Sequence, residues 1–247
     1  MSDETKRDVT RSPLDRRRFL ELGGLSLTAF LAACGSDGPQ WAQGLLAFAE
    51  KKNESVEQLL LKGGARRYAK RTAKDAGDKF PSYFISDAVP VWNESEQGKW
   101  MLQLAGAVKK PMSLSLDDLL KLPSVTQRVD HFCVEGWNAV ARWTGVRLST
   151  LAQLAEPTAD ATFVDFRSFD NDYHESWDMG SAMHPQTIVA YGLDGQMLGP
   201  MHGAPARVHS PVKLGYKNTK YLTRIVFMPA RNGGYWSDQG YEWFGGT

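Results

Sequence analysis

The sequence predicts an α+β fold in which strands dominate. Short segments with an apolar residue at every second position recur after residue 80, whereas helical spacing is confined to a few brief stretches. No glycine-rich phosphate-binding loop follows a predicted strand, so the sequence does not indicate a doubly wound nucleotide-binding fold. These observations favour a β-rich domain with short peripheral helices.

An export signal is predicted over residues 1–33. Three consecutive arginines, 16–18, precede the short apolar stretch 22–33, and a basic segment before a short apolar one is typical of signal peptides. The arginines resemble the twin-arginine signal, which exports folded proteins, and residues 31–34 resemble a lipobox, whose cysteine receives a lipid. We therefore expect a lipoprotein of the cell envelope or periplasm, anchored to the membrane at Cys34. The alternative is a basic tail followed by a short core helix.

Residues 34–79 are expected to form a tether and a helical N-terminal extension. Glycine and proline in residues 35–40 favour a short flexible tether. The apolar residues of 41–74 follow helical spacing until a pair of glycines at 63–64 interrupts it. Two amphipathic helices are therefore predicted to wrap the single domain that residues 80–247 form.

Several short strands and fewer helices are predicted within residues 80–247. The strand that starts at Trp100 has apolar residues at every second position, and Ser115 with Asp118 has the spacing of a capping box at a helix start. A second helix ends before Pro157, and the last fifteen residues, rich in glycine, tyrosine and tryptophan, are expected to be a loop. The predicted strands cover 100–105, 127–134, 162–169, 207–209 and 221–228, and the predicted helical segments cover 115–120, 148–155 and 185–191.

Composition excludes several classes of protein. The 29 lysine and arginine residues nearly balance the 28 aspartate and glutamate residues, and without a basic block the chain has no electrostatic reason to bind nucleic acid. No apolar run approaches the roughly 20 residues of a transmembrane helix. The 2 cysteines allow at most one disulfide, too few for a disulfide scaffold. If Cys34 carries a lipid, Cys133 has no disulfide partner within the chain.

The residues around Cys133 form the candidate reactive centre. On a strand, residues two apart share a face, so His131, Cys133 and Glu135 are expected to project together. Three polar or reactive groups on one face are not a core pattern. The residues alone leave three interpretations of Cys133 open: a buried thiol, a nucleophile activated by His131, and a metal ligand. A zinc site is disfavoured because the sequence has no cluster of Cys and His at metal spacing.

Three motifs resemble the molybdopterin-binding domain of the sulfite oxidase family. They are residues 131–143, which contain Cys-Val-Glu-Gly-Trp from Cys133 onward, residues 199–207 (Gly-Pro-Met-His-Gly-Ala-Pro-Ala-Arg) and residues 211–220 (Pro-Val-Lys-Leu-Gly-Tyr-Lys-Asn-Thr-Lys). The form Cys-Val-Glu-x-Trp resembles the periplasmic methionine-sulfoxide reductase branch of that family. The resemblance runs from about residue 80 to residue 241 and so covers most of the chain after the predicted signal peptide. It implies the sulfite-oxidase-type fold and the cofactor Mo-molybdopterin.

The resemblance implies roles for individual residues. Cys133 would be the thiolate ligand of the molybdenum, since a soft ligand suits such a metal. The implied cofactor-binding residues are His202, Arg207, Lys220, Ser168 and Lys217. Arg207 and Lys220 suit the phosphate of the pterin, and Glu135 and Tyr241 would join Cys133 in the catalytic set by shaping the substrate face. Without the resemblance, Arg207 and Lys220 would be interpreted as surface charges and Tyr241 as a packed aromatic residue.

The resemblance also implies an activity, which is two-electron oxygen-atom transfer by a molybdenum-dependent oxidoreductase, with sulfoxide reduction as one candidate. Sulfite oxidases bind their anion with arginines, but two of those positions are Ser86 and Asn138 here, so sulfite is a poor fit. The chain has no Cys-x-x-Cys-His haem motif, and electrons are therefore expected from a separate partner, a membrane haem protein or a cytochrome. The expected substrate is a small molecule or a peptidyl group.

Three alternative functions stay open at this point. The chain could be a cofactor-free binding or scaffold lipoprotein on the same fold, a sulfite-oxidising enzyme, or an enzyme that uses the Cys133 thiol as its nucleophile. The presence of Cys133 together with Arg207 and Lys220 argues against the cofactor-free scaffold.

Overall fold

The computed structural model describes residues 44–45, 48–49, 51–53, 55–56, 59 and 80–247. The predicted signal peptide over 1–33, Cys34 and the tether lie outside the described residues. The described residues from 44 to 59 are helical, and the predicted wrapping of the domain by these helices stays a prediction. No helix in the described part of the chain is long and apolar enough to cross a membrane.

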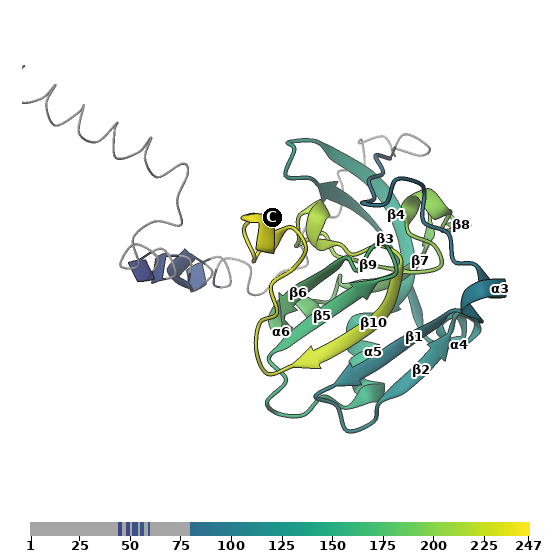
Figure 1. Cartoon of the computed structure of the whole chain (residues 1–247), viewed down its shortest axis with the longest axis horizontal. Coiled ribbons are helices and arrows are strands. Elements are labelled where there is room, and N and C mark those ends of the chain that lie inside the picture. Colours follow the sequence, from purple (N-terminus) through teal and green to yellow (C-terminus); the bar gives the residue numbers. More distant parts are fainter. Residues whose placement is uncertain (1–43, 46–47, 50, 54, 57–58, 60–79) are drawn as a thin grey trace, which may run out of the picture. The chain divides into compact units, whose positions relative to one another are not determined.

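Two five-stranded sheets form the body of residues 80–247 (Figure 1). In spatial order, the first sheet contains β2 (Met112–Ser115), β1 (Met101–Gly106), β10 (Leu222–Met228), β5 (Phe163–Ser168) and β6 (His174–Asp178). The second contains β3 (Ser124–Phe132), β4 (Asn138–Arg147), β7 (Ile188–Leu193) and β8 (Gln196–Met197), with β9 (Arg207–His209) paired to β7. Strands β1 and β10 pair in parallel, and the other pairs are antiparallel. The predicted β-rich α+β fold is confirmed.

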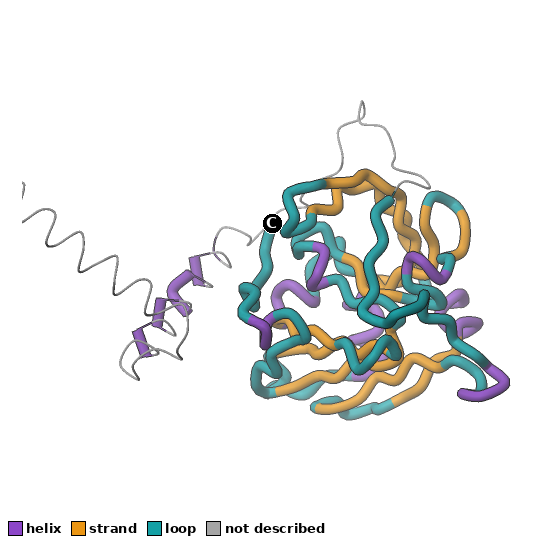
Figure 2. The backbone as a smooth tube through the Cα atoms, turned by 45° about the horizontal axis from the view of Figure 1, so that its top comes forward, coloured by secondary structure: helices purple, strands orange, loops and turns teal. Residues whose placement is uncertain are grey.

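Short helical segments lie between many of the strands, and two more precede β1 and follow β10 (Figure 2). They are α3 (Glu94–Gln97), α4 (Leu116–Lys121), α5 (Leu148–Ala155), α6 (Met179–Ala182) and the 3-10 turns η2 (Pro200–His202), η3 (Gly215–Lys217) and η4 (Ser237–Gln239). The predicted capping box begins α4. The Ser115 hydroxyl accepts a hydrogen bond from the Asp118 N–H at 3.2 Å, and the Asp118 carboxylate accepts one from the Ser115 N–H at 3.0 Å. Helix α5 ends before Pro157, as predicted.

The main apolar core packs the first sheet against α5 and part of the second sheet. Leu102 and Leu104 of β1 are buried together with the preceding Trp100, which confirms the predicted alternation. A second cluster surrounds the fully buried Trp143 of β4 and includes Phe80. Phe80 also lines the cavity described below, so this second cluster supports the candidate site.

The prediction of a helical start over 185–191 is wrong. Residues 188–193 form β7, and every residue of this strand is buried. A strand that is buried on both faces has no alternation of apolar and polar residues, so spacing alone cannot distinguish it from a buried helix. Strand β6, with the sequence His-Glu-Ser-Trp-Asp, is not predicted at all, because its buried residues include polar ones.

The strand predicted over 127–134 ends earlier, with the end of β3. Cys133 begins a tight turn in which its carbonyl oxygen accepts a hydrogen bond from the Gly136 N–H at 3.1 Å. Gly136 adopts a φ of 86°, which favours glycine. His131 lies on the strand, whereas Cys133 and Glu135 lie in the segment that joins β3 to β4. The expectation that these three residues share the face of one strand is therefore wrong.

Replacement of Ser115 by alanine should lower the free energy of unfolding by about 1 kcal/mol, because α4 loses its N-cap acceptor. Chemical denaturation followed by circular dichroism measures this change. Ser113→Ala, at an exposed position of β2, is the matched control and should change the free energy of unfolding by less than about 0.5 kcal/mol. Equal effects of the two substitutions would contradict the capping role of Ser115.

Candidate active site

A cavity of about 330 Å³ opens beside Cys133. Its wall is assembled from segments that are far apart in the sequence, which are residues 80–85, the turn after β3, the end of β5, β9, η3 with residues 218–221, and the C-terminal segment. Six of the predicted site residues line it: Cys133, Glu135, Ser168, Arg207, Lys220 and Tyr241. A cavity of this size is typical of a site for a small molecule or a cofactor.

The turn that carries Cys133 holds its half-buried side chain at the cavity. The Cys133 N–H donates a hydrogen bond to the carbonyl oxygen of Trp137 at 3.0 Å, which fixes the backbone of the turn. Gly215 of η3 packs closely against the same region. A Cβ at this glycine would lie 3.6 Å from Cys133 Sγ and 3.0 Å from His131 Nε2. The absence of a side chain at 215 therefore lets η3 form the wall of the cavity next to the sulfur.

Glu135 lies beside the thiol in a fixed position. Its Oε2 atom is 4.0 Å from Cys133 Sγ and accepts a hydrogen bond from Trp137 Nε1 at 3.0 Å. The Trp137 ring stacks on the ring of Tyr83 with the two centroids 6.2 Å apart, and the hydrogen bond with Glu135 raises the pKa of Tyr83. Two aromatic side chains thus hold a carboxylate next to the sulfur.

The surroundings of Cys133 do not support a nucleophile activated by His131. Burial, and to a lesser degree the charge of Arg207, lowers the pKa of His131 to about 3. His131 Nδ1 lies 3.4 Å from Nε2 of His209, whereas the thiol hydrogen-bonds to Glu135. Burial also raises the pKa of the Cys133 thiol, although a nucleophilic cysteine needs a lowered pKa.

Arg207 brings a buried positive charge to the cavity. Its guanidinium donates to the carbonyl oxygens of His202 at 3.2 Å and Asn218 at 3.1 Å, and its Cζ lies 4.9 Å from the centre of the Trp143 ring. Burial lowers the pKa of Arg207 to about 10. Every acceptor that this guanidinium bonds among the described residues is a backbone carbonyl, so its charge is available to an anionic ligand.

Lys220 brings a second positive charge to the same cavity. Its Nζ donates to Ser82 Oγ at 3.2 Å and to the carbonyl oxygen of Met201 at 3.1 Å. Burial, followed by the charge of Arg207, lowers the pKa of Lys220 to about 7. Gly203 makes room for this side chain, because its φ of 97° favours glycine and a Cβ there would lie 2.8 Å from Lys220 Cβ. Two cations that bond neutral oxygens fit the phosphate of a cofactor.

Ser168, at the end of β5, joins a contact that the sequence did not reveal. Its Oγ accepts a hydrogen bond from the Asp170 N–H at 2.9 Å. The Asp170 carboxylate accepts hydrogen bonds from the N–H groups of Ile85 at 3.0 Å and Ser86 at 3.1 Å, which attaches residues 80–86 to the end of β5. Asp170 and Ile85 are 85 positions apart, and no local sequence pattern indicates such a contact.

Tyr241 lies at the mouth of the cavity and is 41% exposed. Its ring packs against the rings of Trp236 and Tyr216, with centroids 5.1 Å and 5.5 Å away. The structure combines the two interpretations that the sequence left open, since this tyrosine is packed among aromatic residues and also borders the cavity.

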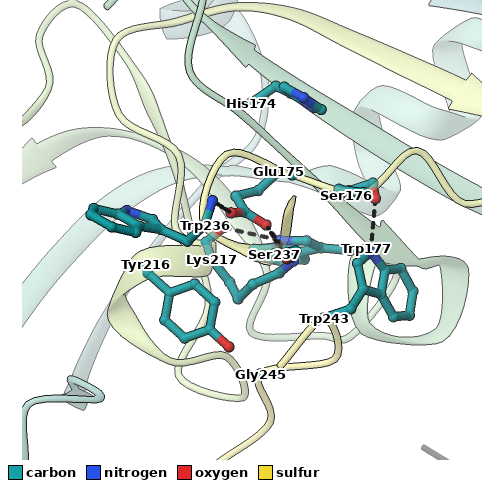
Figure 3. A network of polar contacts seen from close by, with 12 residues as sticks. His174, Glu175, Ser176, Trp177, Tyr216, Lys217, Trp236, Ser237, Trp243 and Gly245 are labelled. Atoms are coloured by element: carbon teal, nitrogen blue, oxygen red, sulfur yellow. Dashed lines mark hydrogen bonds and ion pairs between the residues drawn. The ribbon is translucent and has the colours of Figure 1, made fainter. Parts of the chain in front are cut away.

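Two of the predicted cofactor-binding residues do not line the cavity. His202 belongs to η2, where its carbonyl oxygen contacts Arg207 and its ring lies 5.9 Å from the ring of Phe80. Its predicted cofactor contact stays a prediction. Lys217 is fully buried and forms an ion pair with Glu175 (Figure 3). The position of Lys217 does not support a cofactor contact, because its ammonium group is already neutralised by a carboxylate.

A half-buried thiol and two cations around one cavity fit a site for a soft metal together with an anionic cofactor. Residues 88–236 match the family described as the oxidoreductase molybdopterin binding domain, and the chain belongs to this family. It is therefore an oxidoreductase of the sulfite oxidase family, and its cofactor is Mo-molybdopterin.

Relatives with assigned names support this family. The chain is 37% identical to YedZ1 of Azospira oryzae, named as a subunit of a protein-methionine-sulfoxide reductase, over 94% of this chain and 88% of the relative. It is 31% identical to MsrP of Xanthomonas campestris, a protein-methionine-sulfoxide reductase catalytic subunit, over 91% of this chain and 73% of the relative. The MsrP of Campylobacter jejuni is 36% identical, and this match spans 52% of the chain and 48% of the relative.

A solved structure shows the same fold. The sulfane dehydrogenase SoxCD from Paracoccus pantotrophus superimposes with a TM-score of 0.52 at 23% sequence identity. The similarity covers 57% of this chain and 40% of that chain. At this identity the comparison supports the fold and not the reaction.

The residues that line the cavity fit the cofactor of the family. Among the described residues, no group of three or more His, Cys, Asp or Glu side chains could hold a metal ion. Cys133 would therefore be the ligand that the protein provides, and the pterin would provide further sulfur ligands. Arg207 and Lys220 would hold the phosphate, because their charges are not neutralised by a hydrogen-bonded carboxylate within the described part of the chain.

In protein prepared without its cofactor, sulfate should bind this cavity more weakly as the pH rises through about 7. Lys220 is protonated below its pKa of about 7 and neutral above it, whereas the charge of sulfate stays constant. The loss of one charge-assisted hydrogen bond corresponds to about a tenfold loss of affinity. Isothermal titration calorimetry on both sides of this pH measures the change.

The control for this measurement is Lys220→Arg. Its guanidinium stays protonated, so the variant should bind sulfate with the same affinity throughout the range. An affinity of the unmodified protein that does not depend on pH would contradict the assignment of Lys220 as an anion-binding group.

Proposed function

We propose that this chain is the catalytic subunit of a sulfoxide reductase of the cell envelope, and that its substrate is methionine sulfoxide in peptides or proteins. In the balanced reaction the sulfoxide takes up two electrons and two protons, its S–O bond breaks, and a thioether and water form. Bound Mo-molybdopterin supplies the two-electron chemistry. The names of the relatives from Xanthomonas campestris and Campylobacter jejuni support this proposal.

The position of Glu135 is the observation that favours a neutral substrate over sulfite. Its Oε2 atom lies 4.0 Å from Cys133 Sγ, so an anion at the metal would meet a negative charge. Ser86 and Asn138, at two positions where sulfite oxidases carry arginine, lie outside the cavity lining, and Asn138 Nδ2 donates to Asp130 Oδ1 at 3.3 Å. A sulfoxide carries no net charge and avoids this repulsion.

The exposed mouth of the cavity supports a methionine side chain as the substrate. Tyr83, Val134 and Tyr241 line it and are 59%, 48% and 41% exposed. Trp137 and Trp236 add two more aromatic rings to the lining. Aromatic rings make favourable contacts with sulfur and methylene groups, and exposed side chains at the mouth can contact the polypeptide that carries the oxidised methionine.

Each side chain has a role in this proposal. Cys133 binds the metal, and Arg207 with Lys220 binds the pterin. The Tyr241 hydroxyl donates a hydrogen bond to the sulfoxide oxygen, which orients the S–O bond. Glu135 shapes the substrate face, where its carboxylate disfavours an anion.

We also infer that the electrons come from a separate partner, a membrane haem protein or a cytochrome. The relatives are named as subunits, which supports a system of more than one protein. Arginines 16–18 and Cys34 support export by the twin-arginine route and a lipid anchor. An anchored enzyme stays near a membrane-bound electron donor.

The holoenzyme should reduce methionine sulfoxide in a peptide with reduced benzyl viologen as electron donor. It should oxidise sulfite at least about a hundredfold more slowly. Glu135→Gln removes the charge next to the metal ligand and should lower the KM for sulfite about tenfold, while the KM for the sulfoxide is not lowered. Steady-state kinetics measure the KM for sulfite and the KM for the sulfoxide. The control is Glu156→Gln, which changes an exposed carboxylate paired with Lys110 and should leave both KM values unchanged.

Sulfite oxidation faster than the reduction of any sulfoxide would overturn the proposed reaction. Purified protein that contains neither molybdenum nor pterin, from a host able to make the cofactor, would instead support the cofactor-free scaffold.

Replacement of Cys34 by alanine should move the exported protein from the membrane fraction to the soluble periplasmic fraction, because the lipid is attached to the sulfur of this residue. Cell fractionation with immunoblotting measures the distribution, and Ser36→Ala should stay in the membrane fraction. Retention of Cys34→Ala at the membrane would contradict the lipid anchor.

A further inference from the structure

The C-terminal part of the cavity wall is a segment that has no strand or α-helix of its own. Residues 234–241, here called the wall segment, contain only the 3-10 turn η4. Trp236 and Tyr241 line the cavity from this segment, and the Tyr241 N–H donates to the Trp236 carbonyl oxygen at 3.1 Å. The position of Tyr241 therefore depends on what holds Trp236.

Glu175 of β6 holds the wall segment from inside the protein (Figure 3). Its side chain is fully buried. One carboxylate oxygen, Oε1, accepts a hydrogen bond from the Trp236 N–H at 3.1 Å, and the other, Oε2, accepts one from Ser237 Oγ at 3.3 Å. Gly234 lets the segment pass this close, since a Cβ there would lie only 2.2 Å from Glu175 Oε2.

Lys217 connects the same carboxylate to a second part of the cavity wall, η3. Its fully buried ammonium group forms an ion pair with Glu175 Oε2 and also lies 3.4 Å from Ser237 Oγ. Lys217 belongs to η3, whose first residue, Gly215, packs next to Cys133. The ion pair thus joins the wall segment to the turn that borders the sulfur.

The chemistry of this pair favours a positioning role over a purely stabilising one. Burial raises the pKa of Glu175 and lowers the pKa of Lys217, so removing both groups from water has a cost. Buried ion pairs can often be replaced by apolar residues without loss of stability. Other contacts also hold this region. Within the wall segment the Tyr235 N–H donates to the His174 carbonyl at 2.8 Å, and beyond it the Leu214 N–H donates to the Gly245 carbonyl at 2.8 Å.

We propose that Glu175 and Lys217 are positioning residues that keep Tyr241 at a set place relative to Cys133 and thereby determine how tightly the substrate binds. Neither side chain lines the cavity, so both act through Trp236 and η3. The part of this proposal that concerns the substrate rests on the function proposed above, whereas the part that concerns the wall segment does not.

The test uses the holoenzyme with Glu175→Gln and with the double substitution Glu175→Leu and Lys217→Met. Hydrogen exchange of peptides that cover residues 232–247 should become at least about tenfold faster in Glu175→Gln, while the strands of both sheets stay protected. The KM for a methionine-sulfoxide peptide should rise about tenfold, with kcat and molybdenum content within about twofold of the unmodified enzyme. The double variant restores apolar packing, and it should melt close to the unmodified enzyme but show the same rise in KM.

Asp194→Asn is the matched control. Asp194 lies in the turn between β7 and β8, and its carboxylate accepts a hydrogen bond from the Arg142 N–H at 2.8 Å, just as the Glu175 carboxylate accepts one from a backbone N–H. It should leave both the exchange of residues 232–247 and the KM unchanged. Normal exchange and normal KM in Glu175→Gln, or a normal KM in the double variant, would overturn the positioning role. If the unmodified holoenzyme reduces no sulfoxide, the proposed function fails, and the hydrogen exchange of the wall segment still decides whether Glu175 positions it.

Discussion

Buried positive charge is the constraint on which the structure around the cavity depends. Four cationic side chains, Arg207, Lys213, Lys217 and Lys220, lie in this part of the protein, and a cation removed from water needs a nearby anion. Lys213 and Lys217 each pair with a carboxylate of the first sheet. Arg207 and Lys220 hydrogen-bond only neutral oxygens within the described residues. The chain thus pairs two of the four cations with hydrogen-bonded carboxylates, whereas the other two would be available to an anionic group of the cofactor.

The cavity exists because backbone turns and glycines let distant segments approach one another. The turn after β3 places Cys133 and Glu135 side by side, and Gly215 allows η3 to pack against the sulfur. Residues 80–86 come from another part of the chain, and the Asp170 carboxylate holds them in place through its hydrogen bonds with the N–H groups of Ile85 and Ser86. Each of these segments is therefore held in place by a different contact.

Local patterns predicted secondary structure where a strand or helix has one exposed face. The alternation in β1 and the capping box at Ser115 were therefore predicted correctly. Strand β7 is buried along its whole length. Its apolar residues therefore do not alternate with polar ones, and the segment was wrongly predicted to begin as a helix. Strand β6 was missed because Glu175, which is charged, is buried there. The spacing of apolar residues reveals a strand or helix only when one face is buried and the other is exposed. It fails where neighbouring elements of the protein cover both faces.

By itself, the sequence determined the β-rich fold class, the family and the candidate metal ligand Cys133, because the motifs that carry them are short and continuous in the chain. Only the tertiary structure decided that Glu135 lies next to the sulfur in a turn, that Lys217 pairs with Glu175, and that residues 80–85 line the cavity. The physical reason is that these outcomes depend on burial and on contacts between segments distant in the sequence. Burial decides whether a charged side chain needs a partner within the chain, and the fold decides which partner can reach it.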